Sequence, residues 1–149
     1  MQLDVLDVNK SYGKESILHH IEFSVGSGEI VGLVGESGCG KSTLARLLCC
    51  YEKPDSGKIQ FCGEDTARFG KKERQQFRRS VQMILQDSLS SLDPKMSVGQ
   101  TLHETLKYNG VSDVTQREDK IRKTLEIVLL PADLLAKRPS QLSGGERQR

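Results

Sequence analysis

The sequence lacks the features that mark membrane-spanning and secreted proteins. None of its apolar runs approaches the roughly 20 residues that a transmembrane helix needs, and the run 30–34 is interrupted by Gly32. Residues 1–7 carry charged and amide side chains and no apolar core, so we expect no secretory signal. These absences predict a soluble, cytoplasmic protein.

Metal-binding cysteine pairs and an excess of one charge are also missing. The four cysteines, at positions 39, 49, 50 and 62, include no Cys-x-x-Cys pair, and the three histidines lie elsewhere. We therefore expect reduced thiols rather than a metal cluster or a disulfide framework. The 22 Lys and Arg residues against 20 Asp and Glu residues leave a net charge of +2. That charge is too small to indicate a nucleic-acid partner.

The 149 residues suffice for one ordinary domain, and their patterning changes along the chain. Alternating or continuous apolar residues predict strands at 2–8, 17–25, 29–35, 58–62 and 81–86. Helical spacing begins at Lys41 and continues at 71–79, and after Pro94 two apolar stripes predict two further helices. We expect a mixed α/β first part, 1–87, and an all-helical second part, 88–149.

The strongest motif is a glycine-rich loop between a predicted buried strand and a predicted helix. Residues 35–42 read G-E-S-G-C-G-K-S and match G-x-x-x-x-G-K-[ST], the Walker A pattern. Glycines allow positive φ angles and bring backbone N–H groups close to phosphate oxygens. Lys41 should reach the β- and γ-phosphates, and the Ser42 hydroxyl should hold Mg²⁺. The predicted ATP-binding set is Gly35, Glu36, Ser37, Gly38, Cys39, Gly40, Lys41, Ser42 and Thr43.

A second motif, L-S-G-G-E at 142–146, resembles the signature motif of ATP-binding cassette (ABC) ATPases. Without that resemblance, Ser143 is equally a helix N-cap. The resemblance implies that Ser143, Gly144, Gly145 and Glu146 face the γ-phosphate of an ATP held by a partner subunit.

Two single residues complete the resemblance. Gln86, at the end of the predicted strand 81–86, looks like the family's Q-loop glutamine, which contacts Mg²⁺ and the attacking water; a polar strand end is the alternative. Tyr12 stands where the family places an aromatic ring that stacks on adenine, and a hairpin tyrosine without a ligand is the alternative.

The chain resembles one group of the family, the oligopeptide, dipeptide and nickel importers, in segments 37–48, 77–87, 91–98 and 137–145. At position 88 it differs from most peptide importers, because it has Ser88. The resemblance implies an α/β fold of the P-loop NTPase, ABC type, with an antiparallel β subdomain and a helical subdomain. It implies a peripheral subunit on the cytoplasmic face of the membrane that uses ATP and Mg²⁺. Its partners would be a second ATPase subunit, transmembrane permeases and, indirectly, an extracytoplasmic binding protein.

The family's Mg²⁺-binding aspartate, catalytic glutamate and switch histidine have no counterpart among the 149 residues. We therefore expect a domain truncated after the signature motif, with an incomplete core sheet, its C-terminal half absent and no ATPase activity by itself. Without its neighbour, strand 30–34 should expose an apolar edge and lower the solubility. The alternatives are a soluble ABC ATPase of DNA repair or translation, and a non-functional remnant.

Overall fold

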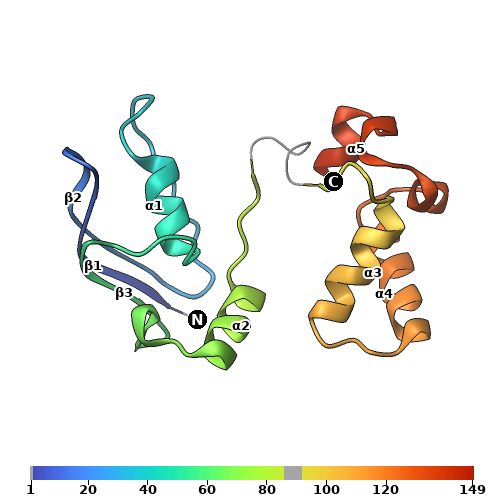
Figure 1. The fold of residues 1–149 in the computed structure, drawn as a ribbon, viewed down its shortest axis with the longest axis horizontal. Helices are drawn as coiled ribbons and strands as arrows, with labels where there is room; N and C mark the ends of the chain where they lie inside the picture. The colour runs from blue at the N-terminus through green and yellow to red at the C-terminus, as the bar shows by residue number, and fades with distance from the viewer. Residues whose placement is uncertain (1, 86–91) are drawn as a thin grey trace. The chain divides into compact units, whose positions relative to one another are not determined.

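The computed structural model describes residues 2–85 and 92–149 of the chain. These residues form two compact units, Met1–Met83 and Ile84–Arg149, which are described separately (Figure 1). The assignment of 1–87 as a partial ATPase core and of 88–149 as a helical subdomain stays a prediction.

The first unit is built on an antiparallel sheet. Its strands are β1 (Leu3–Tyr12), β2 (Glu15–Val25), β3 (Ser56–Phe61) and β4 (Glu64–Asp65), in the order β2-β1-β3-β4. β1 and β2 form a hairpin whose turn contains Gly13 at φ 63°, a left-handed conformation that glycine adopts without strain. The predicted strands 2–8, 17–25 and 58–62 are therefore confirmed, with the first two longer than expected.

Helix α1 (Lys41–Leu48) supplies the other half of this unit's core. Leu44 and Leu47 of this helix are buried against the apolar face of the sheet. The sheet contributes Val5, Val8, Leu18 and Ile59 to the same cluster. Burial of each such side chain contributes about 1.5–3 kcal/mol. The core therefore fixes α1, and with it the loop that precedes α1, against the sheet.

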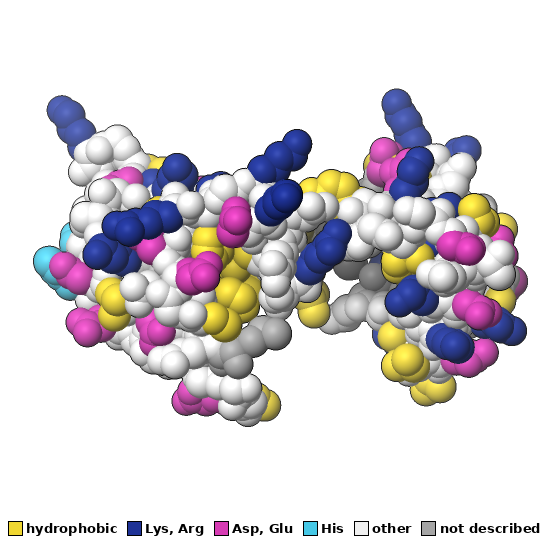
Figure 2. Space-filling model, turned by 90° about the horizontal axis from the view of Figure 1, so that it is seen from below, with side chains coloured by type: hydrophobic (Ala, Val, Ile, Leu, Met, Phe, Trp, Pro, Cys, Tyr) yellow, Lys and Arg dark blue, Asp and Glu magenta, His cyan; other side chains and the backbone are white. Residues whose placement is uncertain are grey.

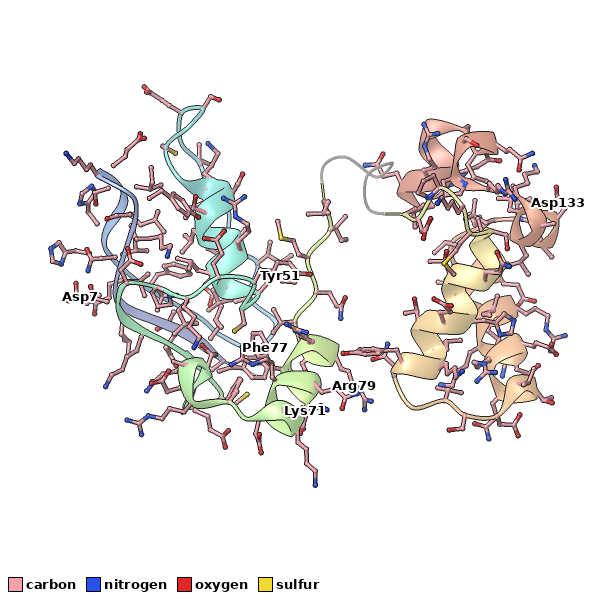
Figure 3. All side chains as sticks on the ribbon, viewed as in Figure 1. Asp7, Tyr51, Lys71, Phe77, Arg79 and Asp133 are labelled. Carbon is pink, nitrogen blue, oxygen red and sulfur yellow. The ribbon has the colours of Figure 1, made fainter. Side chains whose placement is uncertain are left out.

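A short 3₁₀ turn, η1 (Thr66–Arg68), leads into helix α2 (Lys71–Ser80). The ring of Phe77 is buried, with its centroid 5.2 Å from that of Phe61 in an edge-on arrangement and 5.7 Å from that of Phe69. The charged side chains of Lys71 and Arg79 are exposed (Figure 3). The predicted helix 71–79 is confirmed, and one aromatic side chain anchors it.

The second unit is helical, as predicted. It contains α3 (Val98–Tyr108), α4 (Val114–Ile127), η2 (Ala132–Ala136), η3 (Pro139–Gln141) and α5 (Gly144–Gln148). Its buried apolar side chains are Ile121, Leu125, Leu134 and Leu142. Ser97 caps α3 through a reciprocal capping box with Gln100, which satisfies backbone groups at the helix start.

Two predicted strands are wrong. Residues 29–35 and 81–85 have no strand structure, and Gln86 lies outside the described residues. The side chains of Ile30 and Val34 are 97% and 95% exposed, and Ile84 is 91% exposed. An apolar run becomes a strand only when a neighbouring strand exchanges hydrogen bonds with it, and no such neighbour exists in the described part of the chain. Residues 30–34 therefore present exposed apolar side chains, but not the open strand edge that the sequence predicted.

Lysine and arginine side chains are interspersed with aspartate and glutamate on the face drawn in Figure 2. Among residues 2–85 and 92–149, none of the helices has both the length and the apolar character needed to cross a membrane.

Candidate nucleotide-binding site

The glycine-rich loop ends at a position that only glycine can occupy. Gly40 is the N-cap of α1 and has φ 98°, in the left-handed region. A Cβ atom on Gly40 would lie 2.8 Å from Leu18 Cδ2 and 3.0 Å from Ile17 Cγ2, both on strand β2. The close approach of loop and sheet therefore requires a residue without a side chain, as the motif predicts.

The ammonium group of Lys41 lies inside the curve of the loop. Its Nζ atom donates hydrogen bonds to the carbonyl oxygens of Gly35 at 2.7 Å and Glu36 at 2.6 Å. It also lies 3.6 Å from the Sγ atom of Cys39. The loop therefore curls around the single positive charge that the motif assigns to phosphate binding.

The start of α1 carries the other groups that an anion needs. No side chain caps the first turn through Gly40, and that turn contains no acidic residue. Its free backbone N–H groups, at the positive end of the helix dipole, can donate to phosphate oxygens. Ser42 is exposed and Thr43 is buried. Uncapped donors, a lysine and an exposed hydroxyl are groups that could bind a nucleoside triphosphate, and the Ser42 hydroxyl could serve as an oxygen ligand for its Mg²⁺.

Tyr12, at the end of β1, is tied to α1 through two side chains. Its hydroxyl donates to Glu52 Oε2, and Arg46 Nε donates to Glu52 Oε1 at 2.7 Å. The Arg46 guanidinium lies 3.4 Å from the Thr43 hydroxyl. Lys10 Nζ lies 5.5 Å from the centroid of the Tyr12 ring. The ring is therefore held at its hydroxyl edge, while Tyr12 remains 44% exposed to solvent.

The charges around Tyr12 stabilise one another. The Tyr12 hydroxyl, and next the Arg46 guanidinium, lower the pKa of Glu52. Lys10 and the Ser11 backbone N–H lower the pKa of Asp55, and Asp55 in turn raises the pKa of Lys10. Both carboxylates therefore stay ionised at neutral pH and hold their partners.

The signature-like segment forms the start of α5 in the second unit. Ser143 is the N-cap: its hydroxyl accepts from the Glu146 N–H at 3.3 Å, and its own N–H donates to Glu146 Oε2 at 2.7 Å. The Ser143 backbone N–H, and next the Ser143 side chain, lower the pKa of the Glu146 carboxyl group. Arg147 donates to the carbonyl oxygens of Pro139 and Leu142. Ser143 is therefore the predicted N-cap, and Gly144 and Gly145 begin the helix without close neighbours.

The structure thus brings Gly35, Glu36 and Cys39 to the Lys41 ammonium group, and it places Ser143 to Glu146 in the other unit. Gln86 lies outside the described residues. Sequence reasoning missed the four residues around Tyr12: Lys10, Arg46, Glu52 and Asp55. Local spacing gives no signal for them, because Glu52 stands 40 residues from Tyr12.

Known proteins resemble the chain over most of its length. The family described as ABC transporter matches residues 18–149. The nickel import ATP-binding protein NikE of Brucella suis is 42% identical over 136 residues, which cover 91% of this chain and 51% of that protein. A putative peptide import ATP-binding protein of Brucella ovis is 40% identical over 151 residues, covering 99% of this chain and 48% of that protein. The chain therefore spans about half the length of the curated relatives that it matches.

Solved structures agree with this family. A dimeric bacterial ABC transporter cassette, MJ0796, superposes with a TM-score of 0.82 at 26% identity, covering 97% of this chain and 65% of that one. The same cassette in a post-hydrolysis state with ADP and Pi superposes with a TM-score of 0.80 at 25% identity, over 97% of this chain and 65% of that one. The predicted α/β fold of the P-loop NTPase, ABC type, is confirmed. The chain belongs to the ABC transporter family of ATP-binding cassettes.

Proposed function

We propose that the chain binds ATP with Mg²⁺ through residues 35–43, as the nucleotide-binding part of an importer ATPase subunit. The observation that carries the proposal is the loop itself: Gly40 at φ 98° closes it against β2, and Lys41 points into its curve. Such a loop presents backbone donors and one cation to phosphate oxygens.

The remaining predicted residues take defined roles in this proposal. Tyr12 stacks on the adenine ring, and the Ser42 hydroxyl and Gln86 hold Mg²⁺. The metal ion supplies positive charge against the phosphates. Ser143, Gly144, Gly145 and Glu146 face the nucleotide of a second subunit. The capped start of α5 supports this role, because the capping box fixes Ser143 at the helix end.

The importer assignment rests on the relatives. The two named Brucella proteins are import ATP-binding proteins, one for nickel and one putatively for peptides. We propose that the chain acts likewise, as a peripheral subunit on the cytoplasmic face of a membrane. Its partners would be a second ATPase subunit, transmembrane permeases and, indirectly, an extracytoplasmic binding protein. The dimeric arrangement of the related cassette supports a paired subunit.

ATP hydrolysis is the activity of the family, and we assign nucleotide binding to these 149 residues. No run of four apolar residues followed by Asp-Glu occurs in the sequence, so we assign none of its residues as general base. We expect turnover of ATP by this chain alone to stay at background.

Isothermal titration calorimetry with MgATP tests the proposal. Lys41→Ala removes the charge inside the loop, so we expect affinity to fall by about tenfold or more, the usual scale for a lost charge-assisted hydrogen bond. Lys14→Ala, in the exposed hairpin turn, is the matched control and should leave the affinity unchanged. Equal binding by wild type and Lys41→Ala, or no binding by the wild type, would contradict the proposal.

A further inference from the structure

Tyr12 is held by Glu52, which follows α1 in the chain, and Glu52 is held by Arg46 of α1; no role is yet assigned to these two residues. We propose that Glu52, fixed by Arg46, is a positioning residue that sets the Tyr12 ring as a platform for the adenine base. The inference rests on the proposed function, in which Tyr12 stacks on adenine.

The edge of the Tyr12 ring is fixed by a carboxylate that uses both oxygens. Glu52 Oε2 accepts from the Tyr12 hydroxyl, and Oε1 accepts from Arg46 Nε at 2.7 Å. Glu52 itself is restrained by its backbone, because its N–H and that of Tyr51 donate to the Arg46 carbonyl at 3.5 and 2.9 Å. The hydroxyl therefore bonds to a restrained acceptor, and the ring loses rotational freedom before any base arrives.

One face of the ring is covered. Lys10 Nζ lies 5.5 Å from the ring centroid, within the range of a cation–π contact. Lys10 is held there by Asp55 Oδ1 at 2.9 Å and by the Lys53 carbonyl at 3.0 Å, with only 14% of its side chain exposed. Lys10 therefore occupies one face of the ring, and we infer that a planar ligand stacks on the other.

The strand end that carries Tyr12 is anchored to the same segment. The Ser11 N–H donates to Asp55 Oδ2 at 2.7 Å, and the Asp55 N–H donates to the Asn9 carbonyl at 3.0 Å. The segment 52–55 therefore holds the Ser11 backbone, the Tyr12 hydroxyl and, through Lys10, one face of the Tyr12 ring.

The same network continues to the phosphate loop. Arg46 belongs to α1, the helix that Lys41 begins, and its guanidinium lies 3.4 Å from the hydroxyl of Thr43. A chain of side chains from Thr43 through Arg46 and Glu52 thus reaches Tyr12. This chain links the base platform to the phosphate-binding helix in one rigid unit.

A comparison of two ligands separates positioning of the base from general stability. MgATP carries a base, and magnesium tripolyphosphate carries the phosphates alone. Calorimetry should give tighter binding of ATP than of tripolyphosphate to the wild-type chain, because stacking adds to the phosphate contacts. Tyr12→Phe keeps the ring and removes the hydroxyl, and Glu52→Ala removes the acceptor. Each should weaken ATP binding by about three- to tenfold and leave tripolyphosphate binding within about twofold.

The double variant Tyr12→Phe with Glu52→Ala supplies a stricter criterion. Both changes break the same bond, so the loss of ATP affinity should equal that of either single variant rather than their product. Tyr51→Phe is the control, because it also removes one tyrosine hydroxyl, at the residue before Glu52, whose ring is 60% exposed. It should alter neither the affinity for ATP nor the affinity for tripolyphosphate. Circular dichroism checks that each variant folds, and Tyr12→Phe, which removes one atom, keeps the test valid should Glu52→Ala unfold.

Four results would overturn the inference. Equal loss of ATP and tripolyphosphate affinity in Tyr12→Phe and Glu52→Ala would make Glu52 a purely structural residue. Unchanged ATP affinity in both variants would mean that Glu52 has no effect on binding of the base. Equal affinity of the wild type for the two ligands would overturn the base platform but leave the phosphate part of the proposed function intact. If the wild type binds neither ligand, the proposed function and this inference both fail.

Discussion

Cys39 is the exposed thiol of the phosphate loop. Its thiol is exposed and lies 3.6 Å from the ammonium group of Lys41, and a Cβ atom on Gly35 would approach its sulfur to 2.7 Å. A larger group on this sulfur would therefore lie against Gly35 and Lys41, at the place where we propose that phosphate binds.

We expect alkylation of Cys39 by N-ethylmaleimide to abolish binding of MgATP and of magnesium tripolyphosphate alike. Cys39→Ser should bind both ligands and resist the reagent. Cys62→Ser, which removes the other exposed cysteine, should remain as sensitive as the wild type. Calorimetry before and after treatment measures the effect. If treated Cys39→Ser also loses binding, alkylation of another thiol causes the loss and the prediction is wrong.

The residues that sequence reasoning could identify are those whose roles depend on near neighbours. The loop 35–42 and the Ser143 capping box are local, because their bonds join residues within six positions. The Tyr12–Glu52 bond joins residues 40 positions apart, and its partners depend on how the hairpin packs on α1. No spacing rule contains that information, so the network became visible only in the structure.

At the scale of elements, the junction between the loop and α1 depends on Gly40. We expect Gly40→Ala to destabilise the first unit, since alanine combines an unfavourable φ of 98° with contacts of 2.8–3.0 Å to β2. Gly28→Ala is the matched control, because Gly28 also has positive φ, 77°, but no atom within 4 Å of the added Cβ.

Both variants pay the cost of the left-handed backbone, and only Gly40→Ala adds overpacking. The difference in free energy of unfolding between them should therefore be about 1–3 kcal/mol, with Gly40→Ala the less stable. Urea denaturation monitored by circular dichroism measures it. Equal stability of the two variants would mean that β2 moves aside at no cost.

The helices of the first unit could be predicted from the sequence better than its strands. Helices α1 and α2 follow from spacing along one segment, and each needs a single buried face, Leu44 with Leu47 or Phe77. A strand depends on a partner segment as well as on its own residues. The apolar run 30–34 has the composition of a buried strand, yet its side chains are exposed because no described strand pairs with it.

At the scale of the whole molecule, the two halves of the proposed chemistry reside in different units. The first unit contains Tyr12 and the phosphate loop, whereas the second contains the signature-like segment from Ser143. Binding of phosphate to the loop therefore requires groups of the first unit alone. The proposed role of Ser143 requires a second subunit, and a binding experiment on the isolated chain tests only the first of these functions.

The exposed apolar segment 30–34 should govern how the whole protein behaves in solution. Ile30 and Val34 are almost fully exposed, and Val31 and Leu33 are half exposed, so two apolar side chains on each side of Gly32 face solvent. Contiguous exposed apolar side chains on an unpaired backbone favour association between chains. We expect the wild-type protein to self-associate as its concentration rises.

The double substitution Ile30→Ser with Val34→Ser should reduce this association, seen as lower light scattering and a smaller apparent mass by multi-angle scattering. Neither side chain contacts the core, so thermal stability should stay the same. Ile127→Ser is the matched control: Ile127 is 80% exposed, but it stands at the end of α4, away in sequence from the 30–34 segment. If Ile127→Ser lowers the scattering as much as the double substitution does, total exposed apolar area, rather than the unpaired segment, drives association.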